Sequence, residues 1–204
     1  MERFFEWAWL KASDSLVVDR LLIAGDQQEI DRVVEALSLI RQYDPIRYRR
    51  LVRDLRRIWV WAIPYRGQFK KSTWTCELDQ RFVLDEKTSS ELIASVIVHE
   101  ATHARLARVG IEYREELRQR IEQVCIRRQL ASIKGLPKAT EAFDEAERML
   151  DALPDMGDIA MAERAFAGEL EAARYLGVPD WLLQKIVIIR ERRSRRSAAK
   201  LRQN

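Results

Sequence analysis

Cysteine, histidine, proline and glycine are all scarce in this chain of 204 residues, with 2 Cys, 2 His, 5 Pro and 7 Gly. Two cysteines are too few for a disulfide framework, so a reducing, cytoplasmic compartment is expected. The low glycine and proline content excludes a collagen-like or low-complexity chain. Hydrophobic residues make up 47% of the sequence, which is enough for a buried core in a single domain.

Long hydrophobic runs are also missing. The longest stretches without Asp, Glu, Lys or Arg are 58–65 and 92–99, whereas a membrane-spanning helix needs about 20 apolar residues. The first residues do not combine a positive region with an apolar stretch, so no secretory signal is expected. The sequence therefore predicts no transmembrane segment.

Charge of one sign is concentrated near the C-terminus, although the chain as a whole is nearly balanced, with 36 Lys and Arg against 32 Asp and Glu. Seven basic residues and one acid, Glu191, lie within 190–202: Arg190, Arg192, Arg193, Arg195, Arg196, Lys200 and Arg202. A second basic cluster runs from Arg47 to Arg57. The tail is a candidate for nucleic acid or an anionic surface, but its lack of interleaved aromatics favours a solvated helix end.

Hydrophobic spacing predicts helices over the first 40 residues, with Ile30, Val33, Leu37 and Ile40 on one face. Asp44 and the following proline predict the start of a helix that reaches about residue 57. Short aromatic and β-branched runs then predict strands at 58–63, 73–78 and 81–84, which make a small three-stranded sheet.

From residue 88 onward the pattern is helical. Thr88 and Glu91 fit a capping box, and the helix they begin should end at about 109 because Gly110 suits a left-handed closing position. Its middle, 92–98, is apolar on every side, which predicts a buried central helix. Further helices are expected at 112–133, 138–152, 158–176 and from 180 onward.

The motif His99-Glu100-Ala-Thr-His103 lies on that central helix. Histidines at i and i+4 share one helical face and can chelate one Zn²⁺, while Glu100 projects beside that face and can take a proton from a water on the metal. Both histidines of the chain are in the motif. The structural alternative is a pair of hydrogen-bonded core histidines without metal.

A zinc site needs a third protein ligand, and no other histidine exists. If the helices on either side of Gly110 form an antiparallel hairpin, Glu122 lies level with the two histidines. Glu115 and Glu116 then lie one turn or more away, and Glu112 lies further still. We therefore prefer Glu122. Cys125 is more typical of a buried core thiol, as is Cys76, and Glu169 and Glu171 are outside candidates.

The segment 98–104, placed after a short sheet and before a glutamate-bearing helix, resembles the zincin metallopeptidases, and among them the gluzincins. The resemblance covers about 58–130. It implies peptide-bond hydrolysis, with His99, His103 and Glu122 holding zinc and Glu100 acting as general base. It also implies that the strand nearest the active helix, here 81–84 or 73–78, holds a peptide or protein substrate by backbone pairing, and that Tyr113, Tyr175 or an arginine stabilises the oxyanion.

These observations predict an α+β, mostly α fold: one zincin-like domain over 1–189 with its core at about 58–133, extra N- and C-terminal helices, and a basic tail over 190–204. The leading function is a zinc metallopeptidase. The alternatives are a catalytically silent homologue that keeps zinc for structure or for partner binding, and a helical protein that binds nucleic acid through its basic tail, Arg190–Arg202, and through Arg47–Arg57.

Overall fold

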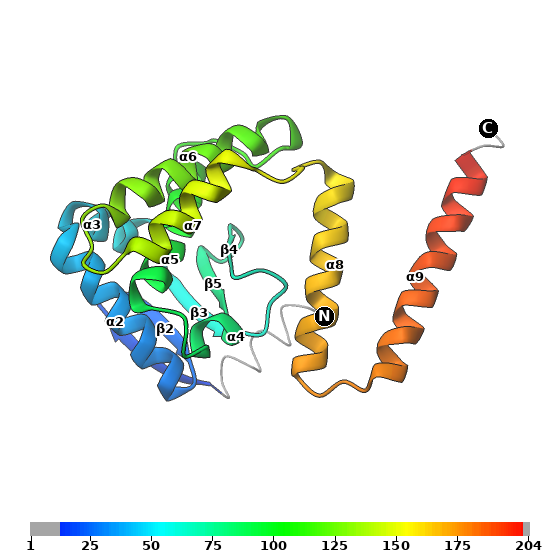
Figure 1. Ribbon diagram of the computed structural model, residues 1–204, viewed down its shortest axis with the longest axis horizontal. Coiled ribbons are helices and arrows are strands. Elements are labelled where there is room, and N and C mark those ends of the chain that lie inside the picture. Colours follow the sequence, from blue (N-terminus) through cyan, green and yellow to red (C-terminus); the bar gives the residue numbers. More distant parts are fainter. Residues whose placement is uncertain (1–12, 202–204) are drawn as a thin grey trace.

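The computed structural model describes residues 13–201, and it shows a mostly helical α+β protein built on one mixed sheet (Figure 1). The strands are β1 (Asp14–Val18), β2 (Leu21–Gly25), β3 (Arg57–Trp61), β4 (Gly67–Lys70) and β5 (Thr75–Asp79). The helices are α2 (Gln27–Tyr43), α3 (Pro45–Asp54), α4 (Gln80–Leu84), α5 (Ser90–Arg108), α6 (Glu115–Ile133), α7 (Thr140–Asp151), α8 (Asp158–Tyr175) and α9 (Asp180–Leu201).

The sheet has the strand order β1-β2-β3-β5-β4. Its three central strands, β2, β3 and β5, run parallel, while β1 and β4 are antiparallel edge strands. Inward residues of the central strands, among them Ile23, Ile58 and Leu78, join one hydrophobic core with α2 and α5. This core extends along the chain from Leu21 to Ala146.

The prediction of an α+β, mostly helical fold is confirmed. The predicted three-stranded sheet is wrong, because the edge strands β1 and β4 were not recognised from the hydrophobic pattern. Residues 14–25, expected to be helical, form a β-hairpin. Asp19 and Arg20 turn it with φ of 49° and 74°, and Val17 and Val18 pair with Leu22 and Leu21 across the turn. Strand β4 lies at the sheet edge, where all four of its residues are half-buried. Its sequence therefore has no apolar run that would predict a strand. The apolar residues 4–10 lie outside the described residues.

Residues 81–84 were expected to be a strand and instead belong to the short helix α4. Asp79 precedes this helix, and the Arg81 guanidinium bonds back to its carboxylate at 2.9 Å, which holds the chain in a turn at the end of β5. A run this short carries no readable period, so an apolar helix turn and a strand look the same in sequence.

The predicted helix boundaries need smaller corrections. The helix that begins at Pro45 ends at Asp54, because Leu55 is extended and leads into β3. Ser89, not Thr88, caps α5 by accepting a bond from the Leu92 N–H at 3.1 Å. Helix α6 begins at Glu115 and not at 112. Gly110 has φ of +84°, so the expected left-handed position after α5 is confirmed.

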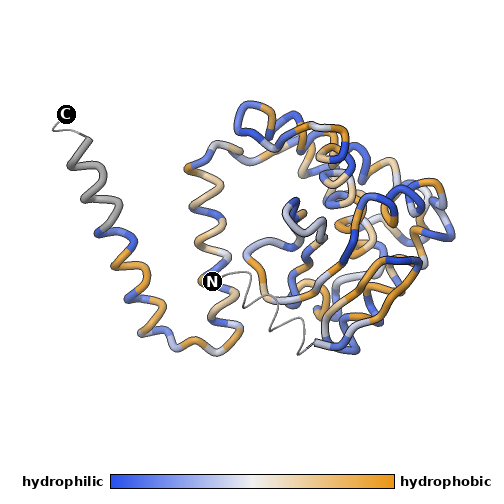
Figure 2. The backbone as a smooth tube through the Cα atoms, turned by 180° about the vertical axis from the view of Figure 1, so that it is seen from behind, coloured by the Kyte–Doolittle hydropathy of each residue, from blue (hydrophilic) through white to orange (hydrophobic). Residues whose placement is uncertain are grey.

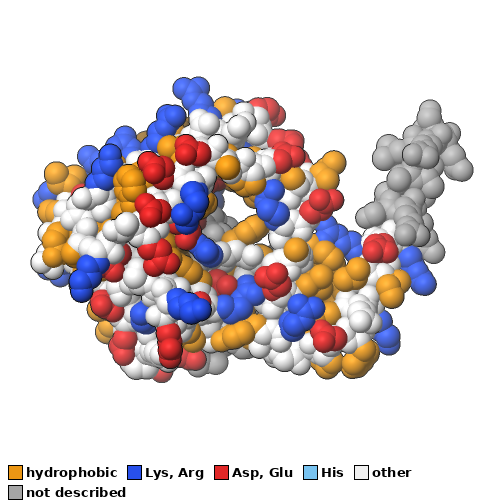
Figure 3. Space-filling model, viewed as in Figure 1, with side chains coloured by type: hydrophobic (Ala, Val, Ile, Leu, Met, Phe, Trp, Pro, Cys, Tyr) orange, Lys and Arg blue, Asp and Glu red, His pale blue; other side chains and the backbone are white. Residues whose placement is uncertain are grey.

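Helices α8 and α9 stand to one side of this body, and α9 packs on α8 (Figures 1 and 2). Gly168 lets α8 approach the chain before β4, since a Cβ there would meet the Pro64 backbone. A groove with charged side chains of both signs, including Arg66, Arg81 and Glu171, lies between α8 and the body (Figure 3). No helix within 13–201 is long and apolar enough to cross a membrane.

Glu29, in the first turn of α2, makes stability depend on pH. Its side chain is buried and accepts a bond from the Asp26 N–H at 2.7 Å, and burial raises its pKa from 4.5 to about 7. The folded state therefore holds a proton that the unfolded chain releases. Stability is lost as the pH rises from about 4.5 through 7, by up to roughly 3 kcal/mol.

Glu29→Gln should therefore raise the free energy of unfolding by up to roughly 3 kcal/mol at pH 8 and leave it nearly unchanged near pH 4.5. Urea unfolding across this range measures the difference. Glu35→Gln, on the exposed face of the same helix, is the matched control. A difference that does not grow with pH would contradict the prediction.

Candidate metal centre

The two histidines and Glu122 meet between the antiparallel helices α5 and α6. Nε2 of His99 lies 3.1 Å from Oε2 of Glu122, and Nε2 of His103 lies 3.3 Å from Oε1 of the same carboxylate. The two Nε2 atoms are 3.2 Å apart. His99 and Glu122 are buried, and His103 is half-buried.

These distances fit a tetrahedral metal ion. Ligands at about 2.0–2.1 Å from such an ion lie roughly 3.3 Å from one another. The two Nε2 atoms are 3.2 Å apart, and each lies 3.1 or 3.3 Å from a different oxygen of the Glu122 carboxylate. The set of two imidazoles and one carboxylate is one that zinc accepts. Residues His99, His103 and Glu122 are therefore placed to hold a divalent ion.

The electrostatics of this cluster keep Glu122 ionised. Burial by itself would raise the pKa of Glu122, but hydrogen bonds and charge from His103 and His99 outweigh it and hold the pKa well below its usual range. Burial likewise disfavours a charged His99, yet Glu122 raises the pKa of that imidazole overall. A buried anion is thus held against two imidazoles.

His99 is oriented by a chain of buried polar groups that the sequence analysis missed. Its Nδ1–H donates to Oε1 of Gln129 at 3.1 Å, and Nε2 of Gln129 donates to the Ser95 hydroxyl at 3.1 Å. Ser95 in turn donates to the Leu92 carbonyl at 2.8 Å. With Nδ1 occupied by its bond to Gln129, Nε2 is the ring nitrogen that faces Glu122 and His103. The spacing of Glu122, Cys125 and Gln129 at i, i+3 and i+7 on α6 is a signal that could have found Gln129.

Cys125 belongs to the same cluster, one turn beyond Glu122. Its thiol and the ligand atoms of His99 and His103 all lie within 4.8 Å of one another, and burial raises the pKa of the thiol. Cys76 is buried in strand β5, opposite Phe69 of β4. The structure therefore adds Cys125 as a possible metal ligand beside Glu122.

Glu100 points toward the edge strand β4 and not toward β5 or α4. A Cβ at Gly67 would lie 3.3 Å from both Cγ and Oε1 of Glu100, and the Phe69 backbone bonds to the Glu100 carboxylate. Burial raises the pKa of Glu100, although His99 and His103 counteract part of the shift. The strand that lies beside Glu100 of α5 is β4, so the expectation that 81–84 or 73–78 lies nearest this helix is wrong.

Strand β4 turns part of its backbone toward Glu100. Asp79 N donates to Arg66 O at 2.9 Å, and the register then pairs Gln68 with Glu77. Because bonded and non-bonded pairs alternate in an antiparallel ladder, the N–H and C=O groups of Gly67 and Phe69 face away from β5. They lie along the edge that Glu100 approaches.

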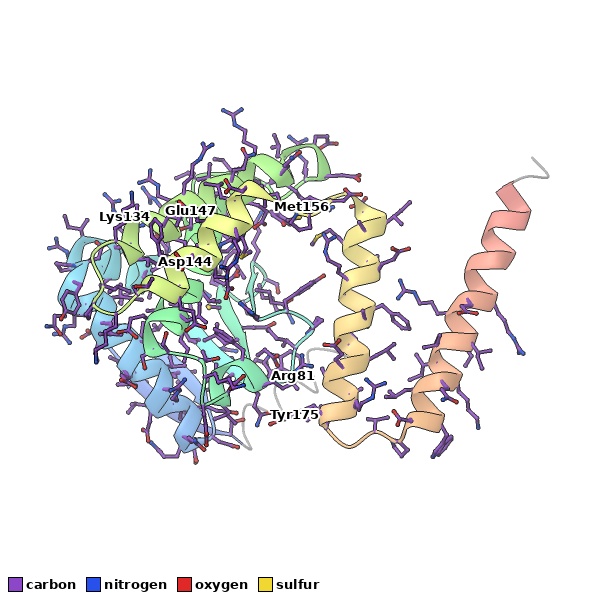
Figure 4. The ribbon with its side chains drawn as sticks, in the orientation of Figure 1. Arg81, Lys134, Asp144, Glu147, Met156 and Tyr175 are labelled. Atoms are coloured by element: carbon purple, nitrogen blue, oxygen red, sulfur yellow. The ribbon has the colours of Figure 1, made fainter. Side chains whose placement is uncertain are left out.

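The two tyrosines proposed for oxyanion stabilisation lie at different places. The Tyr113 hydroxyl donates to Oε1 of Glu122 at 2.5 Å, and its ring centroid is 5.3 Å from that of His103. Partial burial and the Glu122 carboxylate raise the pKa of Tyr113. Tyr175 is exposed at the C-terminal end of α8, at the opposite end from Met156 (Figure 4). Tyr113 alone of the two is at the cluster.

The other glutamates considered as ligands lie outside the cluster of His99 and His103. Glu115 accepts a bond from the Asp158 N–H at 2.8 Å, and Glu112 lies 4.0 Å from Lys71. Glu171 lies 3.8 Å from Arg81. Glu116 and Glu169 are exposed. None of the five belongs to the cluster of His99 and His103.

No family model, no curated protein and no solved structure matches the chain. A functional assignment therefore rests on the geometry of the site.

Proposed function

We propose that this protein is a zinc-dependent metallopeptidase whose metal is held by His99, His103 and Glu122. The observation that carries the proposal is the set of separations of 3.1–3.3 Å between the His99 and His103 nitrogens on α5 and the Glu122 carboxylate on α6. When bound, zinc supplies a Lewis acid that polarises a carbonyl and lowers the pKa of water to about 7.

The chain's own residues supply the general base, the strand that holds the peptide and the donor to the oxyanion. Glu100 lies next to His99 and is offset by about 100° around the helix, so its carboxylate suits the attacking water better than the metal. It takes a proton from that water and passes it to the leaving amine. The Phe69 backbone holds the Glu100 carboxylate, while the outward backbone of Gly67 supports an extended peptide by strand pairing. The Tyr113 hydroxyl is the nearest candidate to stabilise the oxyanion.

Purified protein supplemented with zinc should contain one zinc ion per chain and melt at a higher temperature than protein treated with chelator. Free zinc at 100 times its Kd adds about 2.7 kcal/mol, which corresponds to roughly 5–11 °C for a domain of this size. Elemental analysis and thermal melts measure both quantities. His103→Ala should abolish the shift, and protein that binds no zinc would contradict the proposal.

The hydrogen-bond chain behind His99 should matter for metal affinity. Gln129→Leu removes the acceptor for Nδ1–H, so we expect zinc affinity to fall roughly 10–100-fold, measured by competition with a chelating dye. Gln129→Glu keeps an acceptor and should retain tight binding. Gln119→Leu, exposed on the same helix, is the control. Equal zinc affinity for all three variants would contradict the proposed role of Gln129.

The position of Cys125 favours a second candidate function, a catalytically silent zinc protein. Structural zinc sites have four protein ligands, whereas catalytic sites keep one position open. A thiolate from Cys125 would close the site and leave no position for water. Cobalt-substituted protein distinguishes the two, because only thiolate ligation gives a sulfur-to-cobalt charge-transfer band that Cys125→Ser abolishes.

A further inference from the structure

Three arginines surround one buried aspartate on the side of α5 that faces α3. Asp54, the last residue of α3, is 1% exposed. Arg53 donates to it from Nε at 2.7 Å, and Arg108 lies 2.9 Å away through its own Nε. Arg105 approaches the same carboxylate at 4.0 Å.

One carboxylate leaves most of this positive charge uncompensated. The three guanidinium-bearing side chains remain 44–49% exposed, so about two net positive charges face the solvent. Arg108 is further held by a bond from its NH2 group to the Arg53 carbonyl at 2.8 Å, and it lies 5.4 Å from the ring centroid of Trp74. Fixed side chains lose little entropy when they bind a ligand.

The basic surface continues beyond these three residues. Arg49 and Arg50 are exposed one turn earlier on α3, and Arg56 follows Asp54 with its N–H bonded to the Trp74 carbonyl. Within the segments 45–57, 70–74 and 101–111, Asp54 is the single acidic residue in the sequence. Asp44 and Glu112 border these segments and pair with Arg47 and Lys71. Figure 3 shows Lys and Arg side chains along the margin formed by α3 and α6.

The chemistry of this face matches phosphate. Guanidinium groups bond phosphate oxygens in a bidentate fashion, and arginine is preferred over lysine for that geometry. A row of separate arginines along one helix, with a fixed group of three beside it, suits repeated anions better than a single one. We infer that this arginine surface binds the phosphodiester backbone of a nucleic acid.

The inference does not depend on the proposed zinc chemistry. Arg105 and Arg108 follow His103 on α5, but they point to α3, whereas His99 and His103 point to α6. Of the two basic clusters in the sequence, this surface includes the one at Arg47–Arg57 and leaves out the tail. The structure adds Arg105 and Arg108 of α5 and the turn between β4 and β5. Metal removal should therefore leave nucleic-acid binding intact.

Fluorescence anisotropy with a labelled oligonucleotide, single-stranded and duplex, tests the inference on the full chain between about 50 and 200 mM salt. The double variant R49A/R50A removes two exposed arginines that do not touch Asp54. We expect it to weaken binding about 10-fold at low salt and to reduce the slope of log K against log salt by roughly 1–2. R105A/R108A should weaken binding at least as much.

The matched control is R192A/R195A, which removes the same charge from the basic tail. The inference requires this variant to bind nearly as tightly as the wild type. It is overturned if the tail variant loses binding while R49A/R50A does not, or if the wild type does not bind at low salt. Tighter binding to vesicles containing anionic lipid than to either oligonucleotide would also overturn it, in favour of a membrane surface.

Discussion

Glutamine in place of Glu122 should lower zinc affinity by more than about 100-fold, which exceeds the roughly 10–100-fold effect of losing an outer hydrogen bond to a ligand. Glu122 lies 3.1 and 3.3 Å from the two histidine nitrogens, and a neutral amide is a poorer zinc ligand than a carboxylate. Chelator competition at pH 7 measures the affinity.

Two further variants make this result specific. Glu116→Gln, exposed on the same helix, should bind zinc as the wild type does. If Glu122→Gln also binds normally, the third ligand is another residue, and Cys125→Ser becomes the next variant because its thiol lies within the cluster. Circular dichroism of the metal-free variants separates lost ligation from lost folding.

Glu100→Gln should have the opposite profile, with zinc retained and hydrolysis lost. A general base contributes about 10²–10⁴-fold to rate, so cleavage of labelled casein should fall by that factor. Zinc affinity should change little, because the carboxylate of Glu100 points to the edge of β4 near Gly67 and Phe69. Casein cleavage and chelator competition on the same preparation give both quantities.

The control for this variant is Glu91→Gln, in the first turn of the same helix and two turns before His99. It should cleave casein at the wild-type rate. Hydrolysis that survives in Glu100→Gln would exclude Glu100 as general base. Hydrolysis absent from the zinc-loaded wild type as well would favour the catalytically silent protein, in which Cys125 closes the site.

The long helices and the convergence of Glu122 with the histidines follow from local sequence. The capping box expected at Thr88, the left-handed Gly110 and the apolar run of 92–98 predict α5, although the cap itself is Ser89. A short link to α6 then brings residues equidistant from the turn into register, which places Glu122 opposite His99 and His103. Periods of 3.6 residues over 17–19 residues are strong signals because each turn repeats them.

The short elements do not carry such repetition. Strand β4 has four residues and helix α4 has five, so each is too short to repeat its period often enough to be recognised. Their conformations depend on neighbours: β4 pairs with β5, and α4 is held by the bond between Arg81 and Asp79. The hairpin of β1 and β2 is likewise stabilised by pairing of β2 with β3.

The sequence alone therefore determined the helical hairpin, the two histidines on one of its faces and a glutamate opposite them, because these depend on spacing within continuous helices. Tertiary structure decided what surrounds them. The edge strand beside Glu100, the bond from His99 to Gln129 and the approach of Arg105 and Arg108 to Asp54 each join segments at least 30 residues apart. Such contacts depend on how the elements pack, and packing follows from the complementary shapes of side chains across the whole core rather than from any local period.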